Sequence, residues 1–156
     1  MNNLLGSRWR EAHLGHWLAM SSQRFDAQVL ARMAANEQVP LALANLAARG
    51  SLTASHVHIT RHLSLQGSRL GDLAKCANVS KQAMGKLVDQ CEAWGLVQRM
   101  PDASDARARR VLFTEMGLSW LQAFQEAVSQ TEEELRSAVG AEVATVIALG
   151  LEAYAA

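Results

Sequence analysis

The chain has 156 residues, in which 15 Lys and Arg balance 15 Asp and Glu, and 49% of its residues are hydrophobic. This length and apolar content suit one globular domain with a real core and exclude wholesale disorder. No apolar run approaches the roughly 18 residues of a membrane span, and the start, MNNLLGSRWREAHLGHW, has no uninterrupted hydrophobic stretch of the signal-peptide type. Two cysteines form no disulfide framework, so we expect a soluble protein of the reducing cytoplasm.

The neutral total charge hides an uneven distribution along the chain. Residues 1–68 hold six basic side chains against three acidic ones, and residues 69–110 hold eight against five. Residues 111–156 hold one basic residue against seven acidic ones. A neutral total argues against an indiscriminate polycation, but it leaves room for a local basic face that binds an anion such as DNA.

Helical periodicity dominates the N-terminal part. Apolar residues recur at three- and four-residue spacing over 9–33 and predict a long helix whose pattern is interrupted at Pro40. A short helix is expected over 41–47, and another over 54–65 with Thr53 as its N-cap. No linker or internal repeat interrupts the sequence, so a single domain over 1–156 is expected.

The middle third predicts two short helices joined by a tight turn. Ser68 is the expected cap of the first helix and Ser80 that of the second. Asn78 tolerates the positive φ that such a turn needs, and Ala74 is small enough for a steep helix crossing. Apolar residues stand where a helix-turn-helix buries its inner faces; they are Leu73, Ala77, Val79, Met84 and Leu87.

A β-hairpin is predicted directly after the second helix. Gly95 suits a left-handed cap that ends this helix. Residues 96–100 alternate like a half-buried strand, 101–105 have turn chemistry, and 109–113 return as a strand. Thr114 then caps the next helix. A helix-turn-helix followed by a hairpin with a charged tip is a winged helix.

The run from Leu70 to Gly117 resembles the MarR family of bacterial transcriptional regulators. The resemblance is carried by Leu73-Ala74, Ser80, Gly95-Leu96-Val97, Asp102 to Arg107 and Thr114 to Gly117. It implies a mainly α fold with a small β-wing. In that fold residues 52–117 form the winged helix-turn-helix lobe, and 1–50 and 118–156 form mainly dimerisation helices.

Two positions depart from the family pattern. The wing usually reads Asp-x-Arg-Asp-x-Arg, whereas this chain has Ser104 in place of the first arginine and keeps Asp105 and Arg107. Gly85 stands in the recognition helix where the family usually carries a small hydroxyl residue. A mid-helix glycine costs about 1 kcal/mol relative to alanine.

The second helix is expected to read DNA. Its buried stripe leaves Lys81, Gln82, Gly85 and Lys86 facing outward, and the N-terminal residues of a helix in the major groove lie nearest the base edges. Gln82 can pair with adenine, and Lys81 or Lys86 can reach guanine or phosphate. Ser80 and the free N–H groups at the helix start suit a phosphate oxygen.

The hairpin and its surroundings are expected to complete the DNA contact. Arg107 at the wing tip is placed to enter the minor groove, and Asp105 is expected to direct that arginine by pairing with it. For any single Lys or Arg a solvated surface charge is the simpler interpretation. The constellation of turn, cap and wing favours DNA binding. The expected phosphate rim consists of Arg69, Lys75, Arg99, Arg109 and Arg110.

A homodimer is expected, because one recognition helix covers too few base pairs for useful specificity. The alternative is that the apolar stripes of the flanking helices are buried within one protomer. The interface candidates are Trp9, Leu14, Trp17, Leu18, Leu118, Leu121, Phe124, Val128, Leu135, Val143, Ile147, Leu151 and Tyr154.

The resemblance also implies a small-molecule effector bound between the long helices and the DNA-binding lobe. Trp17, Met20, His56 and His58 are candidates to line that cleft, although core packing explains the Trp and Met equally well. The histidine spacings are compatible with zinc, but no carboxylate or cysteine in the same segment completes a shell, so neither metal nor cofactor is expected.

The two cysteines fall in the helix-turn-helix. Cys91 continues the buried stripe and is expected to be a small apolar residue. Cys76 has Lys75 beside it, which leaves a redox switch as a minor alternative.

The sequence carries no motif for nucleophilic, phosphate-loop or dinucleotide chemistry, so an enzyme is not expected. It favours a homodimeric repressor of a pseudo-palindromic operator, relieved by a small effector. The competing hypothesis is a winged-helix protein-interaction module with weak or no DNA binding. A metal-dependent enzyme or sensor built on the histidines is a third and weaker one.

Overall fold

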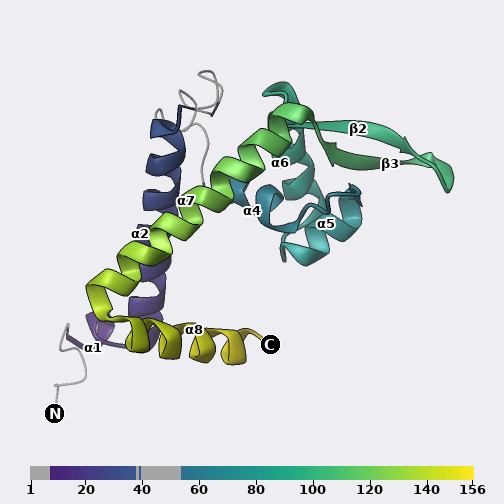
Figure 1. Cartoon of the computed structure of the whole chain (residues 1–156). Helices are drawn as coiled ribbons and strands as arrows, with labels where there is room; N and C mark the ends of the chain where they lie inside the picture. The colour runs from purple at the N-terminus through teal and green to yellow at the C-terminus, as the bar shows by residue number, and fades with distance from the viewer. Residues whose placement is uncertain (1–7, 38, 40–53) are drawn as a thin grey trace, which may run out of the picture.

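The computed structural model describes residues 8–37, 39 and 54–156, and the predicted helix over 41–47 with the Thr53 cap lies outside them. The fold is mainly α with a small β-wing, as the sequence predicts (Figure 1). Its elements are α1 (Arg8–Glu11), α2 (Leu14–Ala35), α4 (Ala54–His62), β1 (Ser68–Arg69), α5 (Leu70–Cys76), α6 (Lys81–Ala93), β2 (Val97–Asp102), β3 (Asp105–Phe113), α7 (Glu115–Val139) and α8 (Ala141–Ala155).

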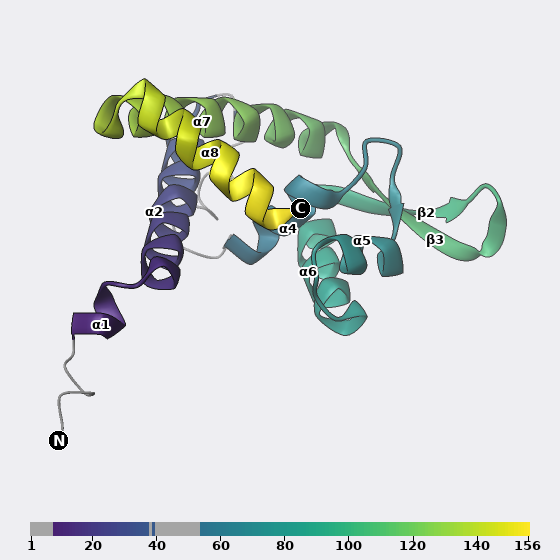
Figure 2. The same cartoon turned by 90° about the horizontal axis from the view of Figure 1, so that it is seen from below.

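Two long helices form one body and the winged helix-turn-helix forms the other. Helices α2 and α7 pack against each other, and the hairpin of β2 and β3 projects away from them (Figures 1 and 2). Helix α8 turns back from the end of α7 across a bend of 119°. Within the part of the chain that the structure describes, no single helix has the length and apolar content of a membrane span, and α7 with α8 reaches them only as this bent pair.

The N-terminal helix is broken where the apolar periodicity predicts continuity. His13 adopts an extended backbone, with φ −96° and ψ 156°, between α1 and α2. Its Nδ1 accepts a hydrogen bond from the backbone N–H of His16 at 3.1 Å, so this histidine is the N-cap of α2. Histidine is not among the usual capping residues, and the apolar pattern runs on through the break. Periodicity alone therefore predicts one helix.

The helix-turn-helix has the predicted turn and second cap. Asn78 has φ 53°, and the Ser80 hydroxyl accepts a hydrogen bond from Ala83 N–H at 3.1 Å to cap α6. The predicted Ser68 cap of α5 is wrong. Ser68 pairs with Val111 in the sheet, and its Oγ accepts a hydrogen bond from Ser64 N–H, while Arg69 takes the N-cap position without a side-chain hydrogen bond.

The wing is longer than predicted and its turn is shorter. The strand order is β1-β3-β2, and β2 continues to Asp102, so Pro101 and Asp102 belong to the strand and not to the turn. Pro101 is tolerated because β2 is an edge strand and its pairing with β3 is irregular between Pro101 and Asp102, and edge strands and bulges are where a sheet accepts proline. β3 begins at Asp105, four residues before the expected start at Arg109.

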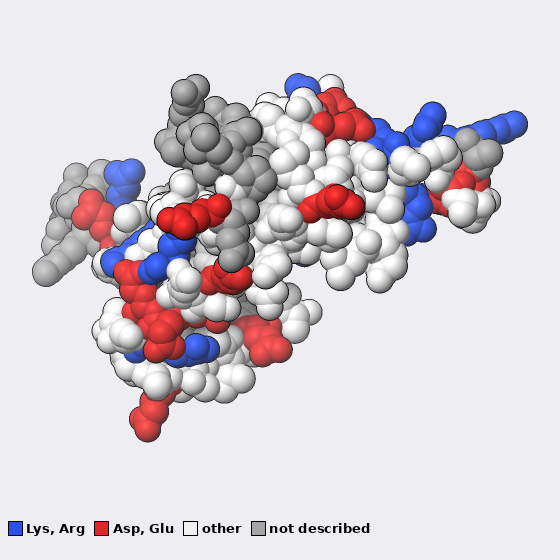
Figure 3. Space-filling view, turned by 45° about the horizontal axis from the view of Figure 1, so that its top comes forward, with Lys and Arg blue, Asp and Glu red and all other residues white. Residues whose placement is uncertain are grey.

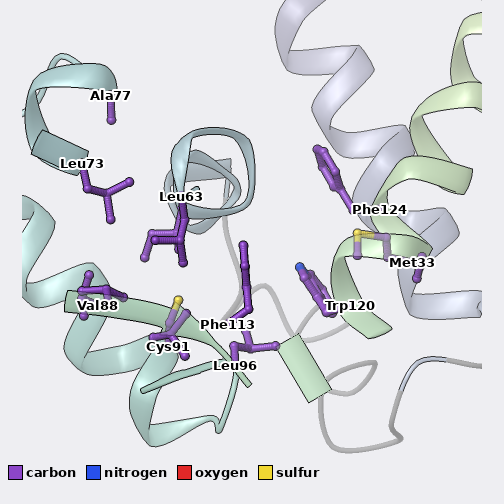
Figure 4. Close-up of a cluster of buried hydrophobic side chains, with 14 of the residues drawn as sticks. Met33, Leu63, Leu73, Ala77, Val88, Cys91, Leu96, Phe113, Trp120 and Phe124 are labelled. Carbon is purple, nitrogen blue, oxygen red and sulfur yellow. The ribbon is translucent and has the colours of Figure 1, made fainter. Parts of the chain in front are cut away.

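One hydrophobic core joins the two bodies (Figure 4). Leu73 and Val88 are buried in the helix-turn-helix, while Met33 and Trp120 are buried where α2 meets α7. Between them lie Phe113, at the end of the wing, and other side chains of the cluster. Cys91 is buried in this core as predicted, and burial raises the pKa of its thiol to about 12.

Candidate nucleic-acid interface

Helix α6 presents the face that the sequence predicts. Met84 and Val88 are buried on its inner side, while Lys81, Gln82 and Lys86 are exposed on the outer side. Ser80 uses its oxygen as the helix cap, but its hydroxyl proton remains available to a phosphate oxygen. The start of α6 thus offers free backbone N–H groups beside exposed polar side chains.

A basic cleft lies between the start of α6 and the wing. Arg107 and Arg109 of β3 are both exposed and line the same space, although the pairing with β2 is irregular at this point, where Pro101 pairs with Arg109 and Asp102 with Asp105. The hairpin carries a row of basic side chains at the right of Figure 3. The residues that line the cleft are Arg69, Leu70, Gly71, Asp72, Lys81, Arg99, Arg107, Ala108, Arg109 and Val111. Five residues predicted to bind DNA, from four elements, therefore surround one open space.

Two of these five arginine and lysine side chains are engaged within the protein. Arg69 Nε donates to Asp102 Oδ2 at 2.8 Å. Arg99 contacts Asp89 through Nη2 at 2.5 Å and Glu92 through Nη1, and its backbone N–H donates to the same Glu92 carboxylate. Arg99 therefore connects β2 to α6. Among the described residues, no ion pair involves Lys81, Arg107 or Arg109.

The other predicted phosphate contacts lie outside the cleft lining. Arg110 is half-buried and its Nη2 donates to the Gly67 carbonyl at 2.6 Å, which holds the turn before β1. Lys75 is exposed in the last turn of α5, and Lys86 is exposed on α6. Gly85 leaves space on the same helix, because a Cβ there would meet only the Leu70 side chain, at 3.8 Å.

Asp105 does not pair with the guanidinium of Arg107 in the described contacts. Its Oδ1 accepts the backbone N–H of Arg107 at 3.0 Å, so it shapes the hairpin backbone. The structural role of Asp102 is not among the predictions from the sequence. Part of this role is predictable from the sequence, because Asp often accepts a hydrogen bond from the backbone N–H two residues ahead at a turn. Asp102 Oδ1 accepts Ser104 N–H in this way at 2.9 Å. The partner Arg69, 33 residues away, leaves no local signal.

Asp102 is a buried and strongly stabilised carboxylate. Only 3% of its side chain is exposed. The hydrogen bond from Arg69 and then those from Ser104 lower the pKa of Asp102 well below its ordinary value of 3.8, and the same contact with Asp102 raises the pKa of Arg69. A carboxyl whose pKa is lowered by folding stabilises the fold above its ordinary pKa, and that stabilisation is lost as the pH falls toward the lowered value.

The Asp102→Asn variant is therefore expected to have a lower free energy of unfolding than the wild type. Between about pH 7 and pH 5 the difference between the two proteins, the stability margin, is expected to be constant. The margin shrinks below about pH 4, where the unfolded wild-type carboxyl takes up a proton. Urea unfolding of both proteins at each pH measures this difference. Glu152→Gln, at an exposed carboxylate of α8, is the control. A margin that persists unchanged at about pH 3 contradicts the ion pair.

Of the residues predicted to line an effector pocket, the three whose side chains the structure describes, Trp17, Met20 and His56, have different surroundings. His56 is buried, with Nε2 2.7 Å from Gln90 Oε1 and its ring 4.7 Å from that of Trp94, so its partners lie at α6 and its end. Met20 is exposed on α2, and the side chain of His58 lies outside the described residues. Trp17 instead lines a separate groove. Across the described ranges, no three His, Cys, Asp or Glu side chains are arranged to hold a metal.

That separate groove is apolar and lies between the start of α2 and the end of α8. Some predicted interface residues are buried within the protomer instead, since Phe124 belongs to the core and Leu121 and Val128 pack against it. Only Ala144 of α8 is buried, although Val143, Ile147 and Leu151 are large and apolar. The groove is lined by Leu14, Gly15, Trp17, Leu18, Ser21, Val146, Ile147, Gly150, Leu151 and Tyr154.

Residues 51–108 match a family model described as the MarR family. Solved structures with the same fold include a transcriptional repressor, CouR, bound to a 23-mer DNA duplex, with 18% identity, a TM-score of 0.71 and 100% of both chains covered. Wild-type MarR from E. coli in its apo form has 23% identity, a TM-score of 0.63 and coverage of 90% of this chain and 96% of that one. The PcaV transcriptional regulator from Streptomyces coelicolor, in complex with its natural ligand, has 14% identity, a TM-score of 0.63 and 92% of each chain covered.

Proposed function

We propose that this chain, which belongs to the MarR family by its helix-turn-helix and wing, is a DNA-binding transcriptional regulator and not an enzyme. The observation that carries the proposal is the cleft in which Lys81 at the start of α6 faces the same space as Arg107 and Arg109 of the wing. DNA backbones are anionic, and a helix start beside a basic hairpin suits a major groove next to a minor groove. A DNA-bound repressor shares the fold over the whole chain.

The parts of the site divide into base contacts and phosphate contacts. The exposed amide of Gln82 suits a bidentate contact to adenine, and Lys81 suits guanine or a phosphate. Ser80 and the free N–H groups of α6 hold a phosphate oxygen. Arg107 enters the minor groove, where the negative potential is concentrated, and Arg109 contacts the backbone beside it.

Salt-dependent DNA binding tests this proposal. The purified protein is used to select a duplex from a random-sequence pool, and its affinity for that duplex is titrated across salt concentrations. We expect the affinity to decrease steeply as the salt concentration rises. We expect Lys81→Ala and Arg107→Ala each to weaken binding. Each variant is also expected to reduce the slope of log affinity against log salt concentration by about one for each phosphate that it no longer neutralises. Arg136→Ala, on α7 and paired with Glu132 and Glu133, is the matched control.

The same titration distinguishes DNA binding from the competing function, which is that of a winged-helix protein-interaction module. A protein-interaction module releases few DNA counterions, so its weak DNA affinity would be the same in the wild type and both variants. That result would overturn DNA binding and favour a protein partner for the same winged helix.

The apolar groove between α2 and α8 supports a homodimer. Helix α8 leaves all of its residues except Ala144 unburied, and a continuous apolar surface of this kind marks an interaction site. A second copy is the occupant that DNA recognition requires, because a two-fold dimer presents two recognition helices to half-sites about one helical turn apart. Gly150, inside α8, has no neighbouring atom within 4 Å of a Cβ position, which leaves room for a partner helix.

Repression by occupancy of a pseudo-palindromic operator is the regulatory mode that we propose. A small effector would relieve it by binding a conformation in which the two recognition helices no longer match the half-sites. Relatives of this fold include a repressor on DNA and a regulator with its natural ligand. Such a regulator acts in the cytoplasm, where bacterial DNA lies.

A further inference from the structure

The tip of the wing rests on a buried carboxylate. Asp102 is the last residue of β2, and its side chain is 3% exposed. It accepts hydrogen bonds from Arg69 Nε at 2.8 Å, from Ser104 N–H at 2.9 Å and from the Ser104 hydroxyl at 2.7 Å. These contacts close the two-residue turn between β2 and β3 and leave this carboxylate engaged on both oxygens.

Arg69 connects this turn to the helix-turn-helix. It lies in β1, directly before the first residue of α5, and pairs with Arg110 of β3. Its Nε faces Asp102, and its Nη2 lies 3.4 Å from the Ser104 hydroxyl. A planar guanidinium that addresses two partners fixes direction as well as distance. The tip of the hairpin is therefore tied to the lobe that carries α6.

A second tie holds the base of the hairpin to the recognition helix. Arg99 of β2 contacts Asp89 and Glu92, which are both on α6. With Arg69 at the tip and Arg99 at the base, the hairpin is held at both ends relative to the helix-turn-helix. The basic side chains in the cleft that have no ion pair within the described residues, Lys81, Arg107 and Arg109, remain available to contact DNA.

We propose that Arg69 and Asp102 form a positioning pair that sets where the wing tip stands relative to the recognition helix, and that Arg69 is not itself a phosphate contact. The proposal rests on the proposed function, since it assigns a role within the same DNA interface. The wing arginine Arg107 lies three residues beyond the turn that the pair closes. Its delivery to the minor groove depends on the position of that turn.

Arg69 as a phosphate contact and Arg69 as a positioning residue predict opposite effects of one substitution on DNA affinity. Asp102→Asn removes a negative charge from the DNA face, which strengthens DNA binding if charge alone matters and Arg69 contacts a phosphate. If the pair positions the wing, the same substitution weakens binding, by about tenfold when Arg107 no longer reaches the groove. Asp72→Asn is the matched control, because Asp72 is an exposed carboxylate lining the same cleft, and we expect it to bind slightly more tightly.

The experiment measures the affinity of the full chain for the duplex selected by the wild type. We expect Asp102→Asn, Arg69→Gln and Arg69→Lys to weaken binding alike, because lysine keeps the charge but lacks the fork that addresses both partners. The double variant Arg69→Gln, Asp102→Asn is expected to match either single one, and Arg107→Ala to cost less in the Asp102→Asn background. Far-UV circular dichroism verifies that each variant is folded.

Two results overturn the proposal. One is an Asp102→Asn protein that binds as tightly as the wild type or more tightly. The other is an Arg69→Lys protein with wild-type affinity, which identifies Arg69 as a phosphate contact. Amide hydrogen exchange over residues 103–108, without DNA, is the independent measurement, and we expect faster exchange in Asp102→Asn and Arg69→Gln but not in Asp72→Asn. If the wild type bound no duplex, the proposed function would fail while this exchange pattern still decided the role of the pair.

Discussion

Replacing Gly117 by alanine is expected to destabilise the fold by about 3 kcal/mol, which is near the upper end for adding one methyl group to a packed site. Gly117 lies in the first turn of α7, and a Cβ built there falls 1.9 Å from the carbonyl oxygen of Leu96 and 3.0 Å from its carbonyl carbon. The obstacle is backbone, so no side-chain rotation relieves it. The same junction is held by Thr114, whose hydroxyl donates to the Gly95 carbonyl at 2.5 Å and accepts from Gly117 N–H at 3.0 Å.

Gly85→Ala is the matched control for this prediction. Its new methyl group meets only the Leu70 side chain at ordinary contact distance, so the gain in helix propensity is expected to stabilise the protein by up to about 1 kcal/mol. Urea unfolding at constant pH measures both changes. If the two glycine variants had equal stability, the close approach of α7 to the Leu96 carbonyl would be wrong.

A charge in the apolar groove is expected to abolish the proposed dimer and to reduce the affinity for a duplex with two half-sites by about 100-fold or more. Ile147→Glu places a carboxylate among Trp17, Leu18 and Leu151, where a partner subunit would leave it buried and unpaired. A monomer engages one half-site and loses the effective concentration that links the two. Sedimentation velocity measures the assembly, and a salt-matched DNA titration measures the affinity.

Gln125→Glu is the control, since it adds the same charge on an exposed position of α7 outside the groove. The thermal unfolding of each protein is compared at low concentration, where a fold that depends on the partner loses stability. A dimer that survives Ile147→Glu would exclude this groove as the interface.

The predictable features of this protein are those whose hydrogen bonds are local. Ser80 and Thr114 each cap a helix by accepting an N–H three residues ahead, and Asn78 supplies a positive φ at its own position, so the type of side chain and its place in the apolar pattern are enough to predict these roles. The predictions for Ser68 and Pro101 are wrong because sheet pairing with β3, a strand distant from Ser68, outweighs their local preferences.

The candidate site was predictable in its members but not in their pairing. Lys81, Arg107 and Arg109 stand out by charge and position, and the structure brings them to one cleft. The engagement of Arg69 with Asp102 depends on contacts across 33 residues, which no spacing rule reveals. The sequence likewise does not show which apolar stripes are buried within the protomer. Phe124 and Val143 are both large and apolar, yet Phe124 is buried and Val143 is exposed.

The length of α7 matters for any ligand that binds near α8, at the end of this helix far from the wing. The helix begins against Leu96 beside the wing and runs for 25 residues, about 37 Å, to the bend that leads into α8. A rigid rod of that length is a lever, since a tilt of about 5° at one end displaces the other by about 3 Å. A change in packing near α8 that tilted α7 by a few degrees would therefore shift the end beside the hairpin by ångströms, which is the scale of the fit between a protein and the DNA grooves.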